Sequence, residues 1–264
     1  AQPNMGYITN FGKAHLEGFG SEEGVVKAKS ELYDYLKTHS RLIILNYQDT
    51  QQIAQVGDYD NTYTFSESSK TAVNVKLTTT QPFLSVSLNN TEIQTHLTGM
   101  YNFQNIAAAL TIGSYFELTP LQLKKGIEAY VPANNRSQII QQHSNEILLD
   151  AYNANPSSME VALDNFIAVQ NQNKLAILGD MFELGTTSAK EHSVLINKAT
   201  LINGCKFYFV GSHFFSQKIP HPNFKFFKTF KELQLHLERT TISNTSILIK
   251  GSRGMALERV LKMI

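Results

Sequence analysis

The sequence predicts an α/β fold in two parts, and three observations support this prediction. Residues 59–97 alternate apolar and polar side chains with a period of two, which is typical of antiparallel strands. Beyond residue 136, short apolar runs alternate with amphipathic segments, and this rhythm predicts a parallel, doubly wound sheet. Between the two regions, the run at 132–135 has the composition of a linker. We therefore expect one domain over residues 1–134 and a second over residues 135–264.

Composition limits the class of protein. The chain has 264 residues, of which 42% are hydrophobic and 17% are charged, so it can bury a substantial core. Its net charge of +1 gives no reason to expect a nucleic-acid or acidic-membrane partner. A single cysteine, Cys205, excludes an internal disulfide framework and fits a reducing compartment. No apolar run approaches the roughly 20 residues that span a bilayer, and no secretory signal pattern is visible. We predict a cytoplasmic protein without membrane insertion.

The first domain should open with a strand, a helix and a second strand. The β-branched and aromatic run at 7–11 predicts a buried strand, and RLIILN at 41–46 predicts another. Between them, Ser21 is placed to cap a helix over 22–36. The apolar residues that should line the buried stripe of this helix are Val25, Val26, Ala28, Leu32 and Leu36.

Strands and two further helices should complete the first domain. The period-two segments of 59–97 predict an antiparallel section, in which the Asn-Asn pair at 89–90 forms a two-residue hairpin turn. An alanine-rich helix should then run over 102–116, with Asn102 able to cap it. Pro120 lies where the next helix would begin.

The second domain should contain six strands and four helices in alternation. We expect the strands at 137–142, 147–150, 175–178, 207–210, 224–227 and 247–250. We expect the helices at 157–170, 189–201, 230–237 and 255–261. Ligands of doubly wound sheets sit at the carboxyl ends of the strands. The segments at these ends are Asp150, Gly179-Asp180, Gly211-Ser212 and Lys250-Gly251-Ser252-Arg253.

Two residues of the first domain are candidates for handling charge. His15 lies in a glycine-rich segment, and Lys29 follows it fourteen residues later on the predicted helix. A neutral imidazole is a metal ligand or an acid–base group, but a lone histidine is more often a hydrogen-bonded core residue. A helical lysine is by default solvated. Taken singly, neither residue defines a site.

Other polar residues stand where an anionic ligand could bind. Asn105, one turn into an otherwise apolar helix face, offers an amide that can contact a base edge. Arg136 at the linker can clamp a phosphate, and Asp150 can accept from a ribose hydroxyl or orient a cation. Asn155 before Pro156 should cap a helix. The KGSRG turn at 250–254 offers N–H groups and two cations. No Walker A, HExxH, CxxC or GxSxG motif occurs.

Taken together, these motifs resemble the Mur ligases. The matching segments, in the family's order, are ITNFGKAHLEGFGS, KAKSE, GMYNFQNIAAA, DAYNANPSSM, LGDMFELG and IKGSRGM. The branch they resemble adds D-alanyl-D-alanine to a UDP-N-acetylmuramoyl tripeptide in peptidoglycan synthesis. The resemblance implies the later part of a central ATPase domain at 1–134, a parallel sheet with added antiparallel strands. It implies a Rossmann-like ligase domain at 135–264.

The resemblance also implies a reaction and its residues. ATP would phosphorylate a carboxylate to an acyl phosphate, which the amine of D-Ala-D-Ala would attack, with Mg²⁺ as the metal. His15 would be a magnesium ligand and Lys29, rather than its neighbour Lys27, would ligate the metal as a carbamate. Asn105, Arg136 and Asp150 would contact ATP. The residues implied near the amine substrate are Tyr152, Asn153, Asn155, Lys250, Ser252 and Arg253.

The sequence departs from the family at one position and lacks three of its parts. Tyr101 stands where the family usually has histidine. We find no N-terminal UDP-substrate domain, no phosphate-binding loop and no acidic metal ligand upstream of Gln2-Pro3, so we expect that this chain alone cannot catalyse ligation. The alternatives are a Mur-type ligase for another amino acid and a non-catalytic binding module. A dinucleotide-binding oxidoreductase ranks below both, because no GxGxxG occurs.

Overall fold

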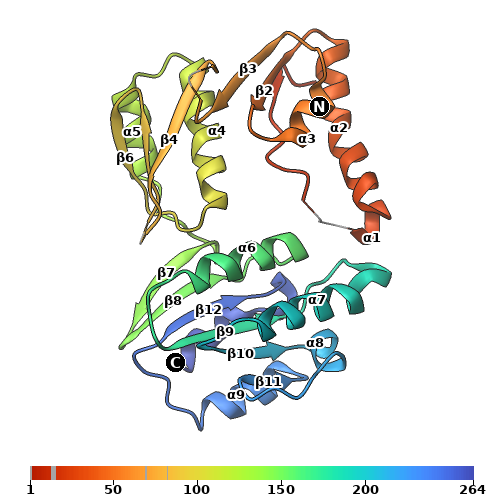
Figure 1. Ribbon diagram of the computed structural model, residues 1–264, viewed down its shortest axis with the longest axis vertical. Coiled ribbons are helices and arrows are strands. Elements are labelled where there is room, and N and C mark those ends of the chain that lie inside the picture. The colour runs from red at the N-terminus through yellow and green to blue at the C-terminus, as the bar shows by residue number, and fades with distance from the viewer. Residues whose placement is uncertain (1, 13–15, 69, 82) are drawn as a thin grey trace. The chain divides into compact units, whose positions relative to one another are not determined.

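The computed structural model describes residues 2–12, 16–68, 70–81 and 83–264 (Figure 1). The chain forms two compact units, one made of described residues within 1–12 and 19–131, the other within 13–18 and 132–264. The elements up to residue 131 are β1 (Met5–Gly6), α1 (Leu16–Phe19), α2 (Glu22–Thr38), β2 (Leu42–Asn46), α3 (Thr50–Val56), β3 (Thr62–Ser66), β4 (Val73–Thr79), β5 (Ser85–Leu88), β6 (Thr91–Gln94), α4 (Tyr101–Tyr115) and α5 (Pro120–Glu128).

The first unit contains a mixed sheet with the order β1-β2-β3-β4-β5-β6. Strands β1 to β4 are parallel, and β4, β5 and β6 are antiparallel. The antiparallel prediction for 59–97 is therefore wrong for β3, which runs parallel to both of its neighbours. Helix α3, which the sequence did not predict, forms the crossover from β2 to β3, and such a crossover returns the chain in the same direction.

The predicted strand at 7–11 is also wrong. Only Met5 and Gly6 pair with β2, after which the chain leaves the sheet. The carbonyls beyond this point bind side chains instead of a neighbouring strand. That of Ile8 accepts from Gln52 Nε2 at 2.9 Å, and that of Asn10 accepts from Lys29 Nζ at 2.8 Å. The run thus leaves the sheet without forming a strand, and of residues 7–12 only Ile8 is buried.

Helices cover both faces of the first sheet. Helix α2 begins where predicted, with the Ser21 hydroxyl accepting from the backbone N–H of Gly24 at 3.1 Å. It buries Val25 and Leu36 as expected, but the third large buried side chain is Tyr33, while Val26, Ala28 and Leu32 are only half-buried. Helices α2 and α3 share one apolar cluster with β2, and α4 and α5 share the cluster of the opposite face.

Two local predictions for the first unit are confirmed. The residues at 89–90 connect β5 to β6 with Leu88 paired to Thr91, and both asparagines have positive φ (48° and 64°), as a two-residue hairpin turn requires. Helix α5 starts at Pro120, with Thr119 and Gln122 forming a capping box.

The second unit is a doubly wound sheet, as predicted. Its order is β11-β10-β9-β12-β8-β7, and all neighbours are parallel except β7 and β8. Its elements are β7 (Gln138–Gln142), β8 (Asn145–Asp150), α6 (Pro156–Ile167), β9 (Lys174–Gly179), η1 (Gly185–Thr187), α7 (Ser188–Thr200), β10 (Cys205–Val210), α8 (Ser212–Ser216), β11 (Phe224–Phe227), α9 (Phe230–Leu237), β12 (Ser246–Lys250), η2 (Arg253–Met255) and η3 (Leu257–Lys262).

Helices cover both faces of this sheet (Figure 1), and contacts of two adjacent residues of β10 illustrate this. Phe209 packs against Phe214 of α8, with ring centroids 5.0 Å apart. Tyr208, whose side chain points to the other face, packs against His236 of α9, with ring centroids 5.2 Å apart. Cys205 opens the same strand as a buried free thiol. The helix predicted at 255–261 is wrong: two 3₁₀ segments lie there, separated by Ala256, which adopts a left-handed conformation with φ of 47°.

The path of the chain marks where a ligand would bind in this sheet. From β8 the chain crosses to β9 and proceeds outward to β10 and β11, and it then returns to place β12 between β9 and β8. The carboxyl ends of β9 and β12 therefore flank a topological switch point, the usual place of a ligand in a doubly wound sheet.

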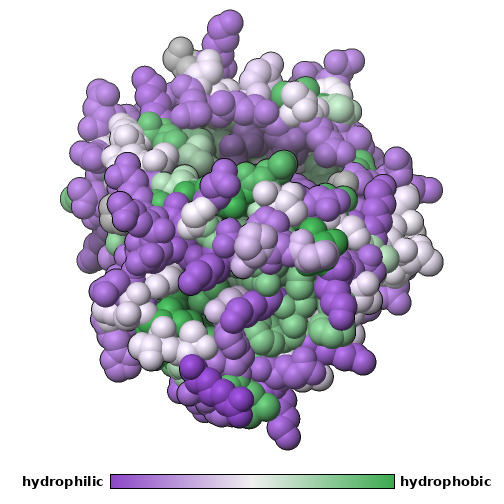
Figure 2. All heavy atoms as spheres, turned by 60° about the horizontal axis from the view of Figure 1, so that its bottom comes forward, coloured by the Kyte–Doolittle hydropathy of each residue, from purple (hydrophilic) through white to green (hydrophobic). Residues whose placement is uncertain are grey.

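The face in Figure 2 is largely hydrophilic with scattered apolar patches. Leu201, at the end of α7, is 82% exposed and is the most exposed of the large apolar side chains described. None of the helices in the described part of the chain combines the length and the apolar character that crossing a membrane needs.

Candidate functional site

A buried ion pair forms the centre of the candidate site in the second unit. Lys250 ends β12 and is in register with Asp150 at the end of β8. The Lys250 ammonium lies 2.5 Å from Asp150 Oδ2 and donates to the carbonyl of Asn153 at 3.2 Å. Lys250 is only 2% exposed, so its charge depends on these partners. The other oxygen of Asp150 accepts from the N–H of Ser137 at 3.2 Å, which ties the residues after the linker to this strand end.

Ser252 joins three strand-end loops. Its hydroxyl accepts from the N–H of Phe182 at 2.8 Å and lies 3.4 Å from the carbonyl of Ala154, to which it donates. Its own N–H donates to the carbonyl of Asp180 at 3.1 Å. Since Ser252 is 3% exposed, its hydroxyl holds protein groups, and its predicted contact with substrate stays a prediction.

Two arginines flank the ring of Tyr152. The guanidinium carbon of Arg136 lies 3.7 Å from the ring centroid and that of Arg253 lies 5.1 Å from it. The pKa of Tyr152 is lowered, chiefly by a hydrogen bond from Arg136 and by the charges of both guanidinium groups. Both arginines are exposed, and neither forms an ion pair with a carboxylate of the described residues. Two guanidinium groups held in this way suit a phosphate or carboxylate.

The two predicted asparagines of the loop after β8 have different roles. Asn155 caps α6, accepting from the N–H of Ser158 at 2.9 Å, with Pro156 in the first turn as predicted. Asn153 is exposed, and its side-chain oxygen accepts from the N–H of Ala154 at 2.9 Å. Its amide nitrogen points to no described partner, so of the two, Asn153 is better placed to meet a ligand.

In the first unit, Lys29 is the better of the two candidate lysines. It is half-buried, whereas Lys27 is exposed. Burial lowers the pKa of Lys29, which favours its neutral amine. His15, the other predicted metal ligand, lies outside the described residues. Among those that are described, no three or more His, Cys, Asp or Glu side chains form a metal cluster. Since magnesium prefers oxygen ligands, Lys29 would suit a magnesium ion as a carbamate, not as an ammonium.

The structure corrects two predictions about α4. Asn102 does not cap the helix, because it lies inside it, where its amide donates to the carbonyl of Thr98 at 2.8 Å. Asn105 does not lie on an apolar face: it and Ala109, one turn later, are both exposed. The Asn105 amide donates to Asn102 Oδ1 at 3.1 Å, leaving its oxygen toward solvent. A contact with adenine therefore remains a prediction that its exposure permits.

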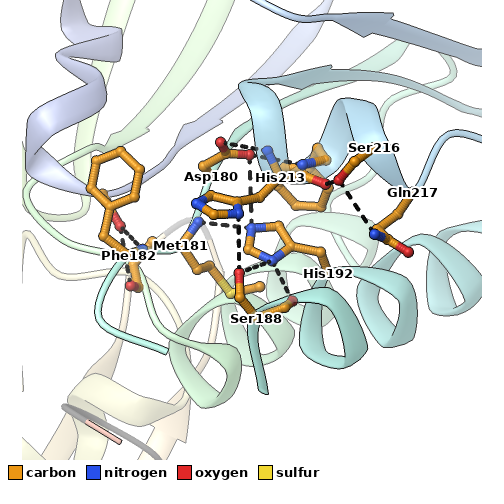
Figure 3. A network of polar contacts seen from close by, with 11 residues as sticks. Asp180, Met181, Phe182, Ser188, His192, His213, Ser216 and Gln217 are labelled. Atoms are coloured by element: carbon orange, nitrogen blue, oxygen red, sulfur yellow. Dashed lines mark hydrogen bonds and ion pairs between the residues drawn. The ribbon is translucent and has the colours of Figure 1, made fainter. Parts of the chain in front are cut away.

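A polar cluster at the ends of β9 and β10 was not predicted from the sequence. It joins Asp180, Ser188, His192 and His213 (Figure 3). The sequence contained a signal for it, since His192 shares the buried side of α7 with Leu195, Ile196 and Ala199. A histidine in such a stripe needs buried polar partners.

Comparison with known proteins agrees with this architecture. The family model of the Mur ligase middle domain matches residues 1–113, and that of the Mur ligase, glutamate ligase domain matches residues 135–253. The chain belongs to the Mur ligase family. Within it, the chain is 30% identical to the UDP-N-acetylmuramoyl-tripeptide–D-alanyl-D-alanine ligase of Rickettsia prowazekii, over 98% of this chain and 60% of that one.

Solved structures agree with the sequence comparison. MurF from Acinetobacter baumannii is 26% identical with a TM-score of 0.83, covering 99% of this chain and 59% of its own. MurF from Thermotoga maritima, solved in complex with ADP, is 20% identical with a TM-score of 0.81, covering 100% of this chain and 62% of its own. The chain thus spans about 60% of the length of the curated relative.

Proposed function

We propose that the complete gene product is an ATP-dependent amide ligase that adds D-alanyl-D-alanine to a UDP-N-acetylmuramoyl tripeptide. The observation that supports this most is the 30% identity, across nearly the whole chain, to a relative named for that reaction. The ADP bound to the Thermotoga maritima relative supports ATP as the nucleotide. We also propose the cytoplasmic location that was predicted from the sequence.

The site of the second unit suits the charges of such a reaction. A carboxylate oxygen of the tripeptide attacks the γ-phosphorus of ATP, and the acyl phosphate forms as ADP leaves. The amine of D-Ala-D-Ala then attacks the acyl carbon, and phosphate leaves as the amide forms. Every species carries negative charge, so we assign anion binding to the exposed guanidinium groups of Arg136 and Arg253. Asp150, which is also proposed to contact ATP, orients Lys250, with which it is paired.

The residues proposed to contact the ligands divide between the two units. Asn105, Arg136 and Asp150 are proposed for ATP. Tyr152, Asn153, Asn155, Lys250, Ser252 and Arg253 are proposed for the amine substrate, with the hydroxyl of Ser252 and the amide of Asn155 acting mainly through the loops that they hold.

Lys29 is proposed to hold magnesium together with His15 after carbamylation. Its neutral amine adds to CO₂ and releases a proton, so that a cation becomes an anionic oxygen ligand. Magnesium would offset the negative charge of the phosphates. The lowered pKa of Lys29 supports this step, because only the unprotonated amine reacts.

Carbamylation can be tested by ¹³C NMR on protein equilibrated with ¹³C-bicarbonate. We expect a carbamate resonance that Lys29→Arg abolishes and that Lys27→Arg retains. If the resonance is lost in the Lys27 variant instead, the carbamate forms on Lys27. If no resonance appears at neutral or higher pH, Lys29 forms no carbamate and the proposed magnesium site is wrong.

The ligase activity is tested with a panel of amines and the complete gene product. Phosphate release should require ATP, the UDP-linked tripeptide and D-Ala-D-Ala together. A preference for a single amino acid over the dipeptide would instead support a ligase of another branch. Binding of the nucleotide without turnover of any amine would support the non-catalytic alternative.

A further inference from the structure

Asp180 anchors the loop that follows β9. Its buried carboxylate, 1% exposed, accepts from the N–H groups of His213 and Phe214, each at 2.9 Å, at the start of α8 (Figure 3). This approach needs glycine at 211, because a Cβ there would lie 2.2 Å from the carboxylate and the residue has φ of 122°. The first residue of the loop is thus fixed to the neighbouring strand end.

His192 holds the next residue of the loop, and its tautomer follows from its partners. It is fully buried on α7, with Nδ1 at 2.7 Å from the carbonyl of Ser188. A carbonyl only accepts, so Nδ1 carries the proton. Nε2 lies 3.1 Å from the backbone nitrogen of Met181, whose N–H only donates, so Nε2 is unprotonated. Burial lowers the pKa of His192, which favours this neutral form.

The loop passes this constraint on to the candidate site. Phe182, which follows Met181, donates its N–H to the Ser252 hydroxyl at 2.8 Å, and Ser252 donates its own N–H to the carbonyl of Asp180 at 3.1 Å. Ser252 lies between Lys250 and Arg253 in the turn after β12. Two hydrogen bonds thus separate the imidazole of His192 from the turn that carries both cations.

We propose that His192 is a positioning residue of the site, whose unprotonated Nε2 holds Met181 and Phe182 where they fix Ser252 and the turn from Lys250 to Arg253. It touches no proposed substrate and acts through the loop. Its effect on catalysis rests on the proposed ligase function, whereas the hydrogen-bond chain does not.

Protonation would break this arrangement. A proton on Nε2 would turn the acceptor of Met181 N–H into a second donor. Two titratable groups face the ring. Asp180 Oδ1 lies 3.7 Å from Nε2 and would accept from such a donor, and His213 of α8 stacks on the ring with the two ring centroids 5.3 Å apart. The ring of His192 would bond Asp180 and release Met181. We therefore expect the site to lose its geometry as the pH falls through the pKa of His192.

The structural half of the proposal is tested by NMR with histidine and methionine labelled with ¹⁵N. We expect the Nδ1–H tautomer for His192 and a scalar coupling through the hydrogen bond between Met181 N and His192 Nε2. Acidification should abolish the coupling as the ring protonates. An Nε2–H tautomer, or no coupling at neutral pH, would overturn the proposal whether or not the protein is a ligase.

The functional half compares three variants. His192→Phe keeps the ring packing but removes the acceptor, and we expect kcat/KM for D-Ala-D-Ala to fall about tenfold, as loss of a partner for a buried N–H implies. His192→Gln keeps an acceptor near Nε2 and should remain within about threefold of the wild type. The matched control is His213→Gln, which changes the neighbouring imidazole but leaves Met181 bonded.

The pH profile separates positioning from mere stability. The wild type and His213→Gln should lose activity at acidic pH, and His192→Gln should lack this acid limb, because an amide does not titrate there. An acid limb that persists in His192→Gln, or a wild-type kcat/KM in His192→Phe, would overturn the proposal. If the wild type ligates nothing, the proposed function fails, and the NMR experiment still decides the hydrogen-bond chain.

Discussion

The carboxyl ends of the parallel strands are built differently in the two sheets. In the second sheet, charged groups are paired or capped within the protein, as in the Lys250–Asp150 pair and the Asp180 carboxylate at the start of α8. In the first sheet, side-chain amides bond the polar groups at the strand ends instead. Gln52 bonds the backbone of Ile8 and Asn46, and the Asn46 amide donates to Gln104 at 2.6 Å.

This difference shows what each edge still needs from a ligand. At the carboxyl edge of the second sheet, Asp150, Lys250 and Asp180 are paired or capped, whereas the exposed guanidinium groups of Arg136 and Arg253 form no ion pair with a described carboxylate, so that edge suits an anion. The ammonium of Lys29 in the first unit binds only a carbonyl, at 2.8 Å, within the described residues. In the proposed function, a carbamate on Lys29 would replace this positive charge by a negative one.

The largest expected effect that tests this difference is at the buried Lys250–Asp150 pair. Asp150→Ala leaves the Lys250 ammonium buried without its carboxylate, and we expect a loss of about 4 kcal/mol in the free energy of unfolding. Urea denaturation measures this loss. The matched control is Asp164→Ala, whose pair with Lys198 at 2.7 Å is largely exposed and should matter by less than about 1 kcal/mol. Equal losses in the two variants would show that burial does not set the strength of the pair.

A second prediction concerns the approach of Asp180 to α8. Gly211→Ala places a methyl group against the carboxylate at a positive φ, and we expect it to cost about 3 kcal/mol. Thermal or urea unfolding reports it. Gly126→Ala in α5, where a Cβ would meet nothing within 4 Å, should instead stabilise the helix by about 0.5 to 1 kcal/mol. A stable Gly211 variant would mean that Asp180 does not need this contact.

The smallest expected effect tests the amides of the first sheet. Gln52→Leu removes the partners of the Ile8 carbonyl and the Asn46 N–H, and we expect a loss of about 2 kcal/mol. The neighbouring Gln51 is exposed, so Gln51→Leu should stay within about 0.5 kcal/mol of the wild type in the same denaturation experiment. If Gln52→Leu matches this control, the amide network does not contribute to stability.

The fold could be predicted because hydrophobic periodicity reports burial. All six strands of the second sheet lie where the pattern placed them. Periodicity does not report direction, so β3 was assigned to the wrong kind of pairing: the unpredicted crossover helix α3 decides it. Nor does a β-branched and aromatic run imply a strand, as residues 7–11 show, since the carbonyls of Ile8 and Asn10 bond the side chains of Gln52 and Lys29.

The candidate site was predicted only in part, for a related reason. Position at a strand end was enough to single out Asp150 and Lys250, which the structure joins. The contribution of His192 depends on a backbone N–H in another loop, and no spacing in the sequence encodes that contact. The capping role given to Asn102 failed because the helix starts one residue earlier, which places this side chain inside it.

The buried thiol at the start of β10 has a practical consequence. Burial raises the pKa of Cys205 to about 12, so thiolate-directed reagents should leave it unmodified in the folded protein. It is also the only cysteine of the chain. A second cysteine introduced at an exposed position, such as Leu201→Cys, would therefore give a unique attachment point for a fluorophore while the native thiol is retained.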